Sequence, residues 1–451
     1  MSLFRKIFSG GEEKVEAAVI ASGGSSAASA GVKFGRYTDC NKTKEQVEYW
    51  RKSVEQFKAK AYVDSFEFFL NYLRDVNVDN VTINRSGDLV DFEIIQGSKI
   101  IKGRGDGKKF VAEANIAVMD ASSLPVMRKL MSMNFILRYS KFALNGDKLC
   151  MKFSSHAIDA SPNKLYDALK ELARKADQQD DLLIAEFSSL KEIDTEKIIE
   201  LGADLQEVRY QYMMKLIRDT KAEISRLDPG SMSGGIAFLL LNLSYTIDYL
   251  ILPQGKLTDS LEKIQGMFFA KNDLSTQERN AQIIEEFDKI VAWPKKEVFE
   301  GLYDVKCTFA IARPESHKYI MDFFFKEREK VGWYRDNNYP KIVDSVYSYM
   351  ITYAFFNMGM IYPLSDLLNL CMNALNPEYY RSCGQKTEFI LPDGQLNKSA
   401  IVGEINAILK RAKSDYPNLT VNTSALHFTS VSGFIDSLIV EMDKLNLQRS
   451  Y

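Results

Sequence analysis

Residues 99–116 read KIIKGRGDGKKFVAEANI, and this stretch separates two very different folds. Three alternating glycines with two lysines after them suggest a phosphate-binding loop: Gly103, Gly105, Gly107, Lys108 and Lys109. A Walker loop needs a serine or threonine directly after its lysine, and both this loop and the dinucleotide-binding motif need a helix after their glycines. Here no hydroxyl follows, and apolar residues occupy every second position, as in a strand: Phe110, Ala112, Ala114 and Ile116. We therefore predict a glycine-rich hairpin turn.

The residues on either side of this stretch predict a small α+β domain. The predicted elements follow one another in this order: a helix over 42–76, three strands up to about 119, a helix over 124–135, two strands over 136–158 and a long helix over 161–187. Asn145-Gly146 is a strong hairpin signal because both residues tolerate positive φ. Ser161 followed by Pro162 is typical of a helix start. The N-terminal part is thus predicted to be an α-βββ-α-ββ-α sandwich.

This element order, together with the segment NFILRYSKFALNGDKLCMKFSSH over 134–156 and the long helix after it, resembles the YbjN-like and type III secretion chaperone-like fold. The resemblance covers about Thr43 to Phe187. It implies an α+β sandwich that is often dimeric and has no enzymatic activity of its own. Its secretion members hold extended clients on sheet and helix surfaces.

The resemblance also implies where a dimer or partner would bind. Dimer contacts in this fold are expected on the second helix and the strand beside it. The corresponding residues in this sequence are Met127, Leu130, Met131, Phe135, Leu137 and Tyr139. We predict that they form a dimer or partner interface.

Beyond about Leu190 the sequence predicts a mainly helical domain. Its most apolar run, residues 234–252, contains Asp248, which is costly inside a membrane, so a buried core helix is the better prediction. We expect Asp248 to pair with a lysine or arginine rather than to act as an active-site acid, which is the alternative. The aromatic- and Met-rich residues 319–372 form either a core or a client-binding groove, and we favour the core. The predicted units are 1–36, 37–190 and 191–451.

Composition argues against several classes of function. The 451 residues carry a net charge of -2, which gives no basic footprint for nucleic acid. Five scattered cysteines and three histidines show no metal-binding spacing, and scattered cysteines are typical of a reducing cytoplasm. We expect His156 and His317 to be structural or surface residues. The sequence therefore predicts no catalytic, cofactor-binding or metal-binding residue, although an enzyme with an unrecognised helical active site is a third hypothesis.

The N-terminus has a feature of its own. Residues 2–8 read as a short amphipathic helix, with one apolar face formed by Leu3, Phe4, Ile7 and Phe8. A Gly/Ser/Ala-rich linker follows over 21–35. This tip would dock weakly on a membrane surface or on a partner protein; the alternative is a frayed terminus that contacts nothing.

Together these patterns predict a cytoplasmic, non-enzymatic chaperone or adaptor that binds a protein client or assembly partner, with a homodimer as one arrangement. The alternative is a structural subunit of a membrane-associated assembly, tethered by its N-terminal tip.

Overall fold

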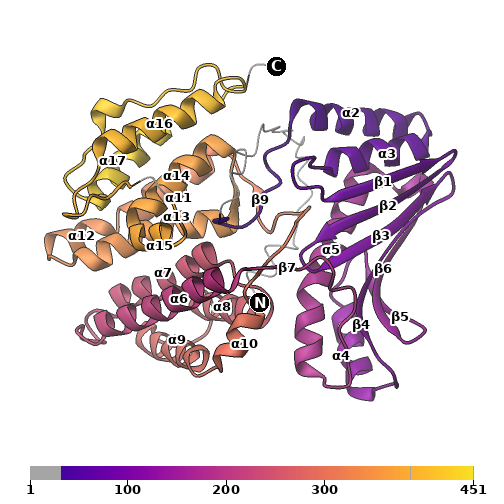
Figure 1. Ribbon diagram of the computed structural model, residues 1–451, viewed down its shortest axis with the longest axis horizontal. Helices are drawn as coiled ribbons and strands as arrows, with labels where there is room; N and C mark the ends of the chain where they lie inside the picture. Colours follow the sequence, from indigo (N-terminus) through magenta and orange to yellow (C-terminus); the bar gives the residue numbers. More distant parts are fainter. Residues whose placement is uncertain (1–31, 386–387, 450–451) are drawn as a thin grey trace.

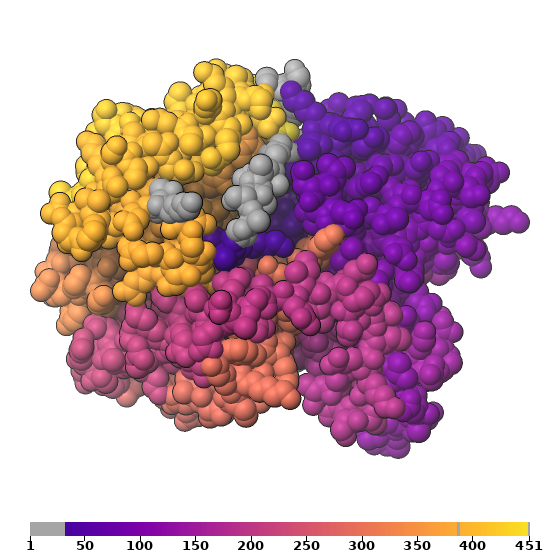
Figure 2. Space-filling model, viewed as in Figure 1, coloured from indigo at the N-terminus to yellow at the C-terminus, as the bar shows by residue number. Residues whose placement is uncertain are grey.

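The computed structural model describes residues 32–385 and 388–449. It contains an antiparallel sheet with its helices in the N-terminal half and many helices in the C-terminal half, which confirms the α+β class and the helical C-terminal part (Figure 1). Each half has its own hydrophobic core. Figure 2 shows the two halves as broad masses in contact, the α+β half in indigo to violet and the helical half in magenta to yellow.

The chain enters the α+β half through two helices, α2 (Lys44–Lys58) and α3 (Tyr62–Leu73), which pack against each other. The single helix predicted over 42–76 is therefore wrong in one respect, because a break at Lys60, with φ of 64°, turns the chain back on itself. Thr43 and Gln46 form a capping box at the start of α2. Where the helices face each other, the Ser53 and Ser65 hydroxyls each donate to the other residue's carbonyl at 2.8 Å.

A six-stranded antiparallel sheet forms the centre of this half, in the order β1-β2-β3-β4-β6-β5. Its strands are β1 (Val81–Ser86), β2 (Leu89–Gln96), β3 (Lys99–Asp106), β4 (Lys109–Val118), β5 (Lys141–Asn145) and β6 (Lys148–His156). Four strands precede the next helix, so the predicted three were one too few. The stretch 99–116 accounts for the difference, because it supplies both β3 and β4.

The predicted hairpin in 99–116 is confirmed, but its turn is confined to Gly107 and Lys108. The Asp106 carboxylate accepts the backbone N–H groups of Lys108 and Lys109 at 2.7 Å. Gly103 lies within β3 instead, where a Cβ atom would come 2.0 Å from the Phe92 ring. The glycine is therefore needed to make room for an aromatic ring, not to form a turn.

The two faces of the sheet differ in character. One face carries cross-strand ion pairs, including Arg104 with Asp91 at 2.7 Å and Lys152 with Glu113 at 3.0 Å. The other face is apolar and is covered by α3 and by the long helix α5 (Pro162–Glu186), which begins at the predicted cap Ser161. Helix α4 (Leu124–Asn134) packs beside β5 (Figure 1). The sheet thus has one buried and one exposed face.

The helical half is built around α7 (Ser233–Ile251) and α13 (Pro340–Asn357), which pack against each other. Its other helices are α6 (Ala203–Ile224), α8 (Gly255–Phe268), α9 (Thr276–Val291), α10 (Lys295–Glu300), α11 (His317–Arg328), α12 (Val331–Asp336), α14 (Tyr362–Leu375), α15 (Pro377–Ser382), α16 (Lys398–Ala412) and α17 (Val431–Asp443). Its short elements are β7 (Ile199–Glu200), β8 (Tyr303–Asp304), β9 (Arg313–Pro314), β10 (Met358–Gly359) and η2 (Thr423–Ala425). One further short element, η1 (Ala157–Asp159), connects β6 to α5 in the α+β half.

Within the part of the chain that the structure describes, only α7 is long and apolar enough to cross a membrane, and 83% of its apolar window is buried inside the protein. This supports the predicted core helix. Its Asp248 is 3% exposed and accepts a hydrogen bond from Arg36 Nε at 2.9 Å, as the sequence predicted. The aromatic- and Met-rich α13 is likewise buried, with Tyr347 and Met350 at 0% exposure. The core prediction for 319–372 is confirmed along this helix.

Two segments cross between the halves and lock them together. The segment before α2 stacks Phe34 on Tyr380 of α15, with ring centroids 4.2 Å apart, and pairs Arg36 with Asp248 of α7. In the opposite direction, the segment after β8 inserts Phe309 into the core of the α+β half, where it is 1% exposed. The relative position of the halves is therefore defined by buried contacts.

Candidate functional site

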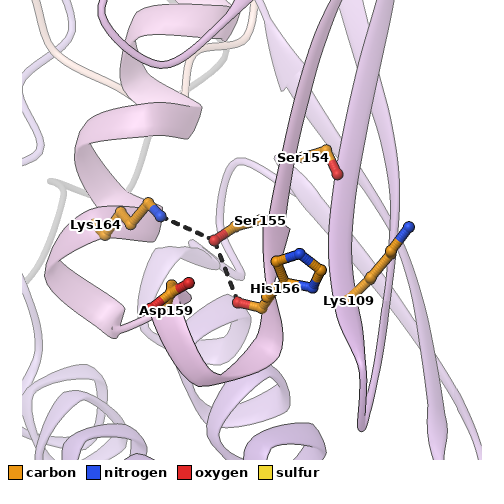
Figure 3. A pocket seen from close by; sticks show the side chains of 6 residues that line it. All are labelled: Lys109, Ser154, Ser155, His156, Asp159 and Lys164. Carbon is orange, nitrogen blue, oxygen red and sulfur yellow. Dashed lines mark hydrogen bonds between the residues drawn. The ribbon is translucent and has the colours of Figure 1, made fainter.

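A polar cavity among the described residues lies where β4 begins, β6 ends and α5 begins (Figure 3). It has a volume of about 250 Å³ and is lined by polar side chains: Lys109, Ser154, Ser155, His156, Asp159 and Lys164. Lys164 Nζ donates to Ser155 Oγ at 2.9 Å, and this hydroxyl donates to the His156 carbonyl at 3.2 Å. In Figure 3, Lys164 lies on the α5 side, whereas Ser154 and Lys109 project from the strands.

These groups do not form an aligned catalytic relay. A nucleophilic serine needs a base within hydrogen-bond reach of its hydroxyl. The Ser155 hydroxyl accepts a hydrogen bond from Lys164 and donates its own proton to a backbone carbonyl, so no side-chain base accepts that proton in this arrangement. Within the described residues, no hydrogen bond reaches the His156 ring, and no group of three metal-ligating side chains is present. His317 lies far along the chain at the start of α11, where its Nε2 is 2.9 Å from the Met442 carbonyl.

The more distinctive surface is an exposed apolar stripe on α4 and the residues just after it. Leu124, Met131, Phe135 and Ile136 are 63%, 72%, 91% and 64% exposed. The first three are spaced by seven and four positions, so they lie on one face of the helix. Large apolar side chains grouped on a surface in this way mark an interaction site more often than isolated ones do. We call these four residues the α4 stripe.

The opposite face of α4 belongs to the core. Val126 and Leu130 are 0% and 4% exposed and pack with the sheet. Met127 and Met133 are partly buried against the same core. Since the helix is already anchored through this face, the α4 stripe is a second apolar face that the fold itself does not use.

The loop that carries Phe135 and Ile136 is held firmly at both ends. The Asn134 side chain accepts from the Phe142 N–H at 2.7 Å and donates to the Phe142 carbonyl at 3.1 Å. These bonds also occupy outward-facing groups of the edge strand β5, which protects it from pairing with another strand. The stripe is therefore presented by a structured end of the helix.

Glu171 of α5 fixes the other end of this loop. Its carboxylate accepts the backbone N–H groups of Arg138, Tyr139 and Ser140 and the Ser140 hydroxyl, at 2.7 to 2.9 Å. Bonds from backbone N–H groups to a carboxylate are among the stronger hydrogen bonds in proteins. The exposed side chains thus project from a backbone whose conformation is already set.

The structure divides the six residues predicted as an interface. Met131 and Phe135 lie fully on the surface. Met127, Leu137 and Tyr139 are partly buried against the core, and Leu130 is inside it. The sequence reasoning missed Leu124 and Ile136; the seven-residue spacing of Leu124 from Met131 could have suggested a second apolar face, whereas Ile136, beyond the end of α4, carries no such signal. The tip residues Leu3, Phe4, Ile7 and Phe8 lie outside the described residues.

One free charge lies within the stripe. Arg128 is exposed on the same helix face, between Leu124 and Met131. Among the described residues it forms no hydrogen bond or ion pair, whereas its neighbour Lys129 pairs with Glu186 at 2.7 Å. The stripe is therefore apolar with one basic group near its middle.

Comparison with known proteins adds no further assignment: no family model matches the chain, and no curated protein matches it.

Proposed function

We propose that this protein is a non-enzymatic chaperone or adaptor that binds a different protein through the α4 stripe. The observation that carries the proposal is Phe135, which is 91% exposed at the end of a helix whose other face packs against the core through Val126 and Leu130. Aromatic side chains, phenylalanine included, and methionine are enriched at the cores of protein interfaces relative to the rest of the surface. The occupant is a protein with an apolar pocket and an acidic group beside it, which would meet Arg128.

The size and rigidity of the stripe suit such a role. Burying a large apolar side chain contributes about 1.5–3 kcal/mol, so the four residues together supply on the order of 6–12 kcal/mol before the costs of association. The bonds made by Asn134 and Glu171 reduce those costs because the loop is ordered before binding.

A second copy of this chain fits the stripe less well. In a symmetric dimer each residue of the patch faces the same patch of its partner. Because Arg128 lies near the middle of the stripe, two antiparallel α4 helices would bring their two guanidinium groups together in the contact. Like charges at an interface are unfavourable, and therefore we propose a different protein as the partner.

The test is to purify the protein with its partners from its native cell, as wild type and as the Met131→Asp, Phe135→Asp double variant. A matched control, Ile158→Asp, changes another apolar side chain that is 66% exposed but lies in η1. We expect the stripe variant to lose one stoichiometric partner that the control retains, with unchanged melting temperatures. Equal recovery of every partner by all three proteins would contradict the proposal.

A further inference from the structure

Three carboxylates of α5, one buried and two half-buried, lie at the contact between the two halves of the protein. Asp177, Asp180 and Asp181 occupy positions i, i+3 and i+4, so they project from one side of the helix. Asp180 is 3% exposed, and one of its oxygens, Oδ1, has no hydrogen-bond partner. We call these three residues the α5 aspartates.

The α5 aspartates contact both halves of the protein. Within the α+β half, Ser98 donates its backbone N–H to Asp177 at 2.8 Å and its hydroxyl to Asp180 at 2.7 Å. Lys99 pairs with Asp180 at 2.8 Å. From the helical half, the Tyr303 hydroxyl donates to Asp181 at 3.3 Å. The cluster therefore joins α5 to the β2–β3 turn and to β8.

Two glycines allow the carboxylates to approach the backbone closely. Gly97, with φ of 59°, lies where a Cβ atom would come 1.6 Å from Asp177 Oδ1. Gly255, at the start of α8 and with φ of 55°, lies where a Cβ atom would come 2.7 Å from Asp181 Oδ2. Since one glycine belongs to each half, the carboxylates are held tightly between the two.

The charges within this contact do not balance if every carboxylate is ionised. Lys99 compensates one of the three, and an uncompensated buried charge is costly, so the site favours binding of additional protons. Burial, and then the neighbouring Asp180, raises the pKa of Asp177 to about 8. The same two causes raise the pKa of Asp181.

Other ionisable groups face the α5 aspartates from each element packed around them: Lys99 from β3, Arg174 from α5, Glu192 from the segment after α5, and Tyr303 and Cys307 from β8 and the residues after it. Arg174 also interacts with Glu262 of α8, so its charge is shared between two acidic groups. Lys99 is therefore the cation that pairs directly with the α5 aspartates, through Asp180.

We propose that Asp177 and Asp181 form a proton-dependent latch between the two halves: protonated, they let α5 pack against Gly255 and Tyr303, and release of their protons to solvent loosens this contact. The sign follows from the direction of the shift. The packed contact binds the proton more tightly than open carboxylates do, so it is favoured at low pH and weakens as pH rises from about 4 to about 8. This inference goes beyond partner binding and does not depend on the α4 stripe.

The test measures backbone hydrogen exchange of the full chain at pH 6 and pH 9, expressed as protection factors so that the intrinsic pH dependence of exchange is removed. Wild type should lose about tenfold or more of its protection over 254–258 and 302–306, since each unit of pKa shift corresponds to a tenfold change. In the Asp177→Asn, Asp181→Asn double variant the loss should fall below about twofold, because neither amide can ionise.

An exposed carboxylate provides the control: Asp219→Asn, whose side chain is 53% exposed on α6, should behave as wild type does. If the double variant fails to fold, Asp181→Asn alone replaces it, and its loss of protection should be smaller than that of wild type because one ionisable carboxylate remains. The proposal is overturned if wild-type protection at these segments is the same at both pH values. It is also overturned if the folded asparagine variant loses as much protection as wild type.

Discussion

Phe309 provides the sharpest test of how the two halves are held together. It lies on the segment after β8, which runs from the helical half to the α+β half. Its ring is 1% exposed in the core of the α+β half. The ring meets Tyr166 edge to face, with centroids 5.6 Å apart, and its N–H donates to Gln96 Oε1 at 2.9 Å. Phe309→Ala keeps the backbone bond but removes the ring and leaves a cavity. We expect it to lower the free energy of unfolding by about 3–5 kcal/mol.

The matched control removes the same atoms from a different environment. Phe135→Ala deletes a ring that is 91% exposed, so its effect on the free energy of unfolding should stay within about 0.5 kcal/mol. Urea unfolding followed by circular dichroism compares both variants with wild type. A cost below about 1 kcal/mol for Phe309→Ala would refute the buried crossing contact, since deletion of a packed core ring does not cost so little. A cost at Phe135 equal to that at Phe309 would refute the exposed stripe.

Two further substitutions test the packing against the sheet and the contact between the halves. Gly103→Ala should lower the free energy of unfolding by about 1–3 kcal/mol because the new methyl group meets the Phe92 ring. Its control, Gly107→Ala, should be close to neutral because nothing lies within 4 Å of its Cβ position. Thermal unfolding measures both variants, and equal melting temperatures would contradict the packing of Gly103 against Phe92. Arg36→Met should lower the free energy of unfolding by about 3–5 kcal/mol, because it leaves the buried Asp248 carboxylate without its partner. Urea unfolding measures this, and an unchanged unfolding midpoint would contradict the Arg36–Asp248 pair.

Features set by neighbouring residues could be predicted from the sequence. The cap at Ser161, the capping box of Ser275 with Glu278 and the hairpin turn at Gly146 all depend on residues within one turn of each other, and all are present. Asp248 could be recognised as a residue that needs a cation, because a carboxylate inside an apolar helix must be compensated. Which cation it pairs with, Arg36, depends on a contact across 212 positions and could not be predicted.

The errors share a physical origin in long-range packing. Gly103 looked like a turn residue because the Phe92 ring that requires it lies on another strand. Leu130 and Met131 are adjacent and similar in hydrophobicity, yet they are 4% and 72% exposed because only one face of α4 meets the sheet. The loop bonds made by Glu171 come from a helix more than 30 positions away. Sequence pattern alone therefore indicated the region of the candidate site but not which of its side chains are on the surface.

The central claim, that the α4 stripe binds a partner, is tested most directly by placing a photo-crosslinking amino acid at position 135 of the full-length protein in its native cell. The same probe at position 158, on the exposed surface of η1, serves as the control. We predict one dominant covalent adduct of defined mass from position 135, which is absent from position 158 and is lost when Met131 is changed to Asp. No adduct from position 135, or the same set of adducts from both positions, would contradict the claim.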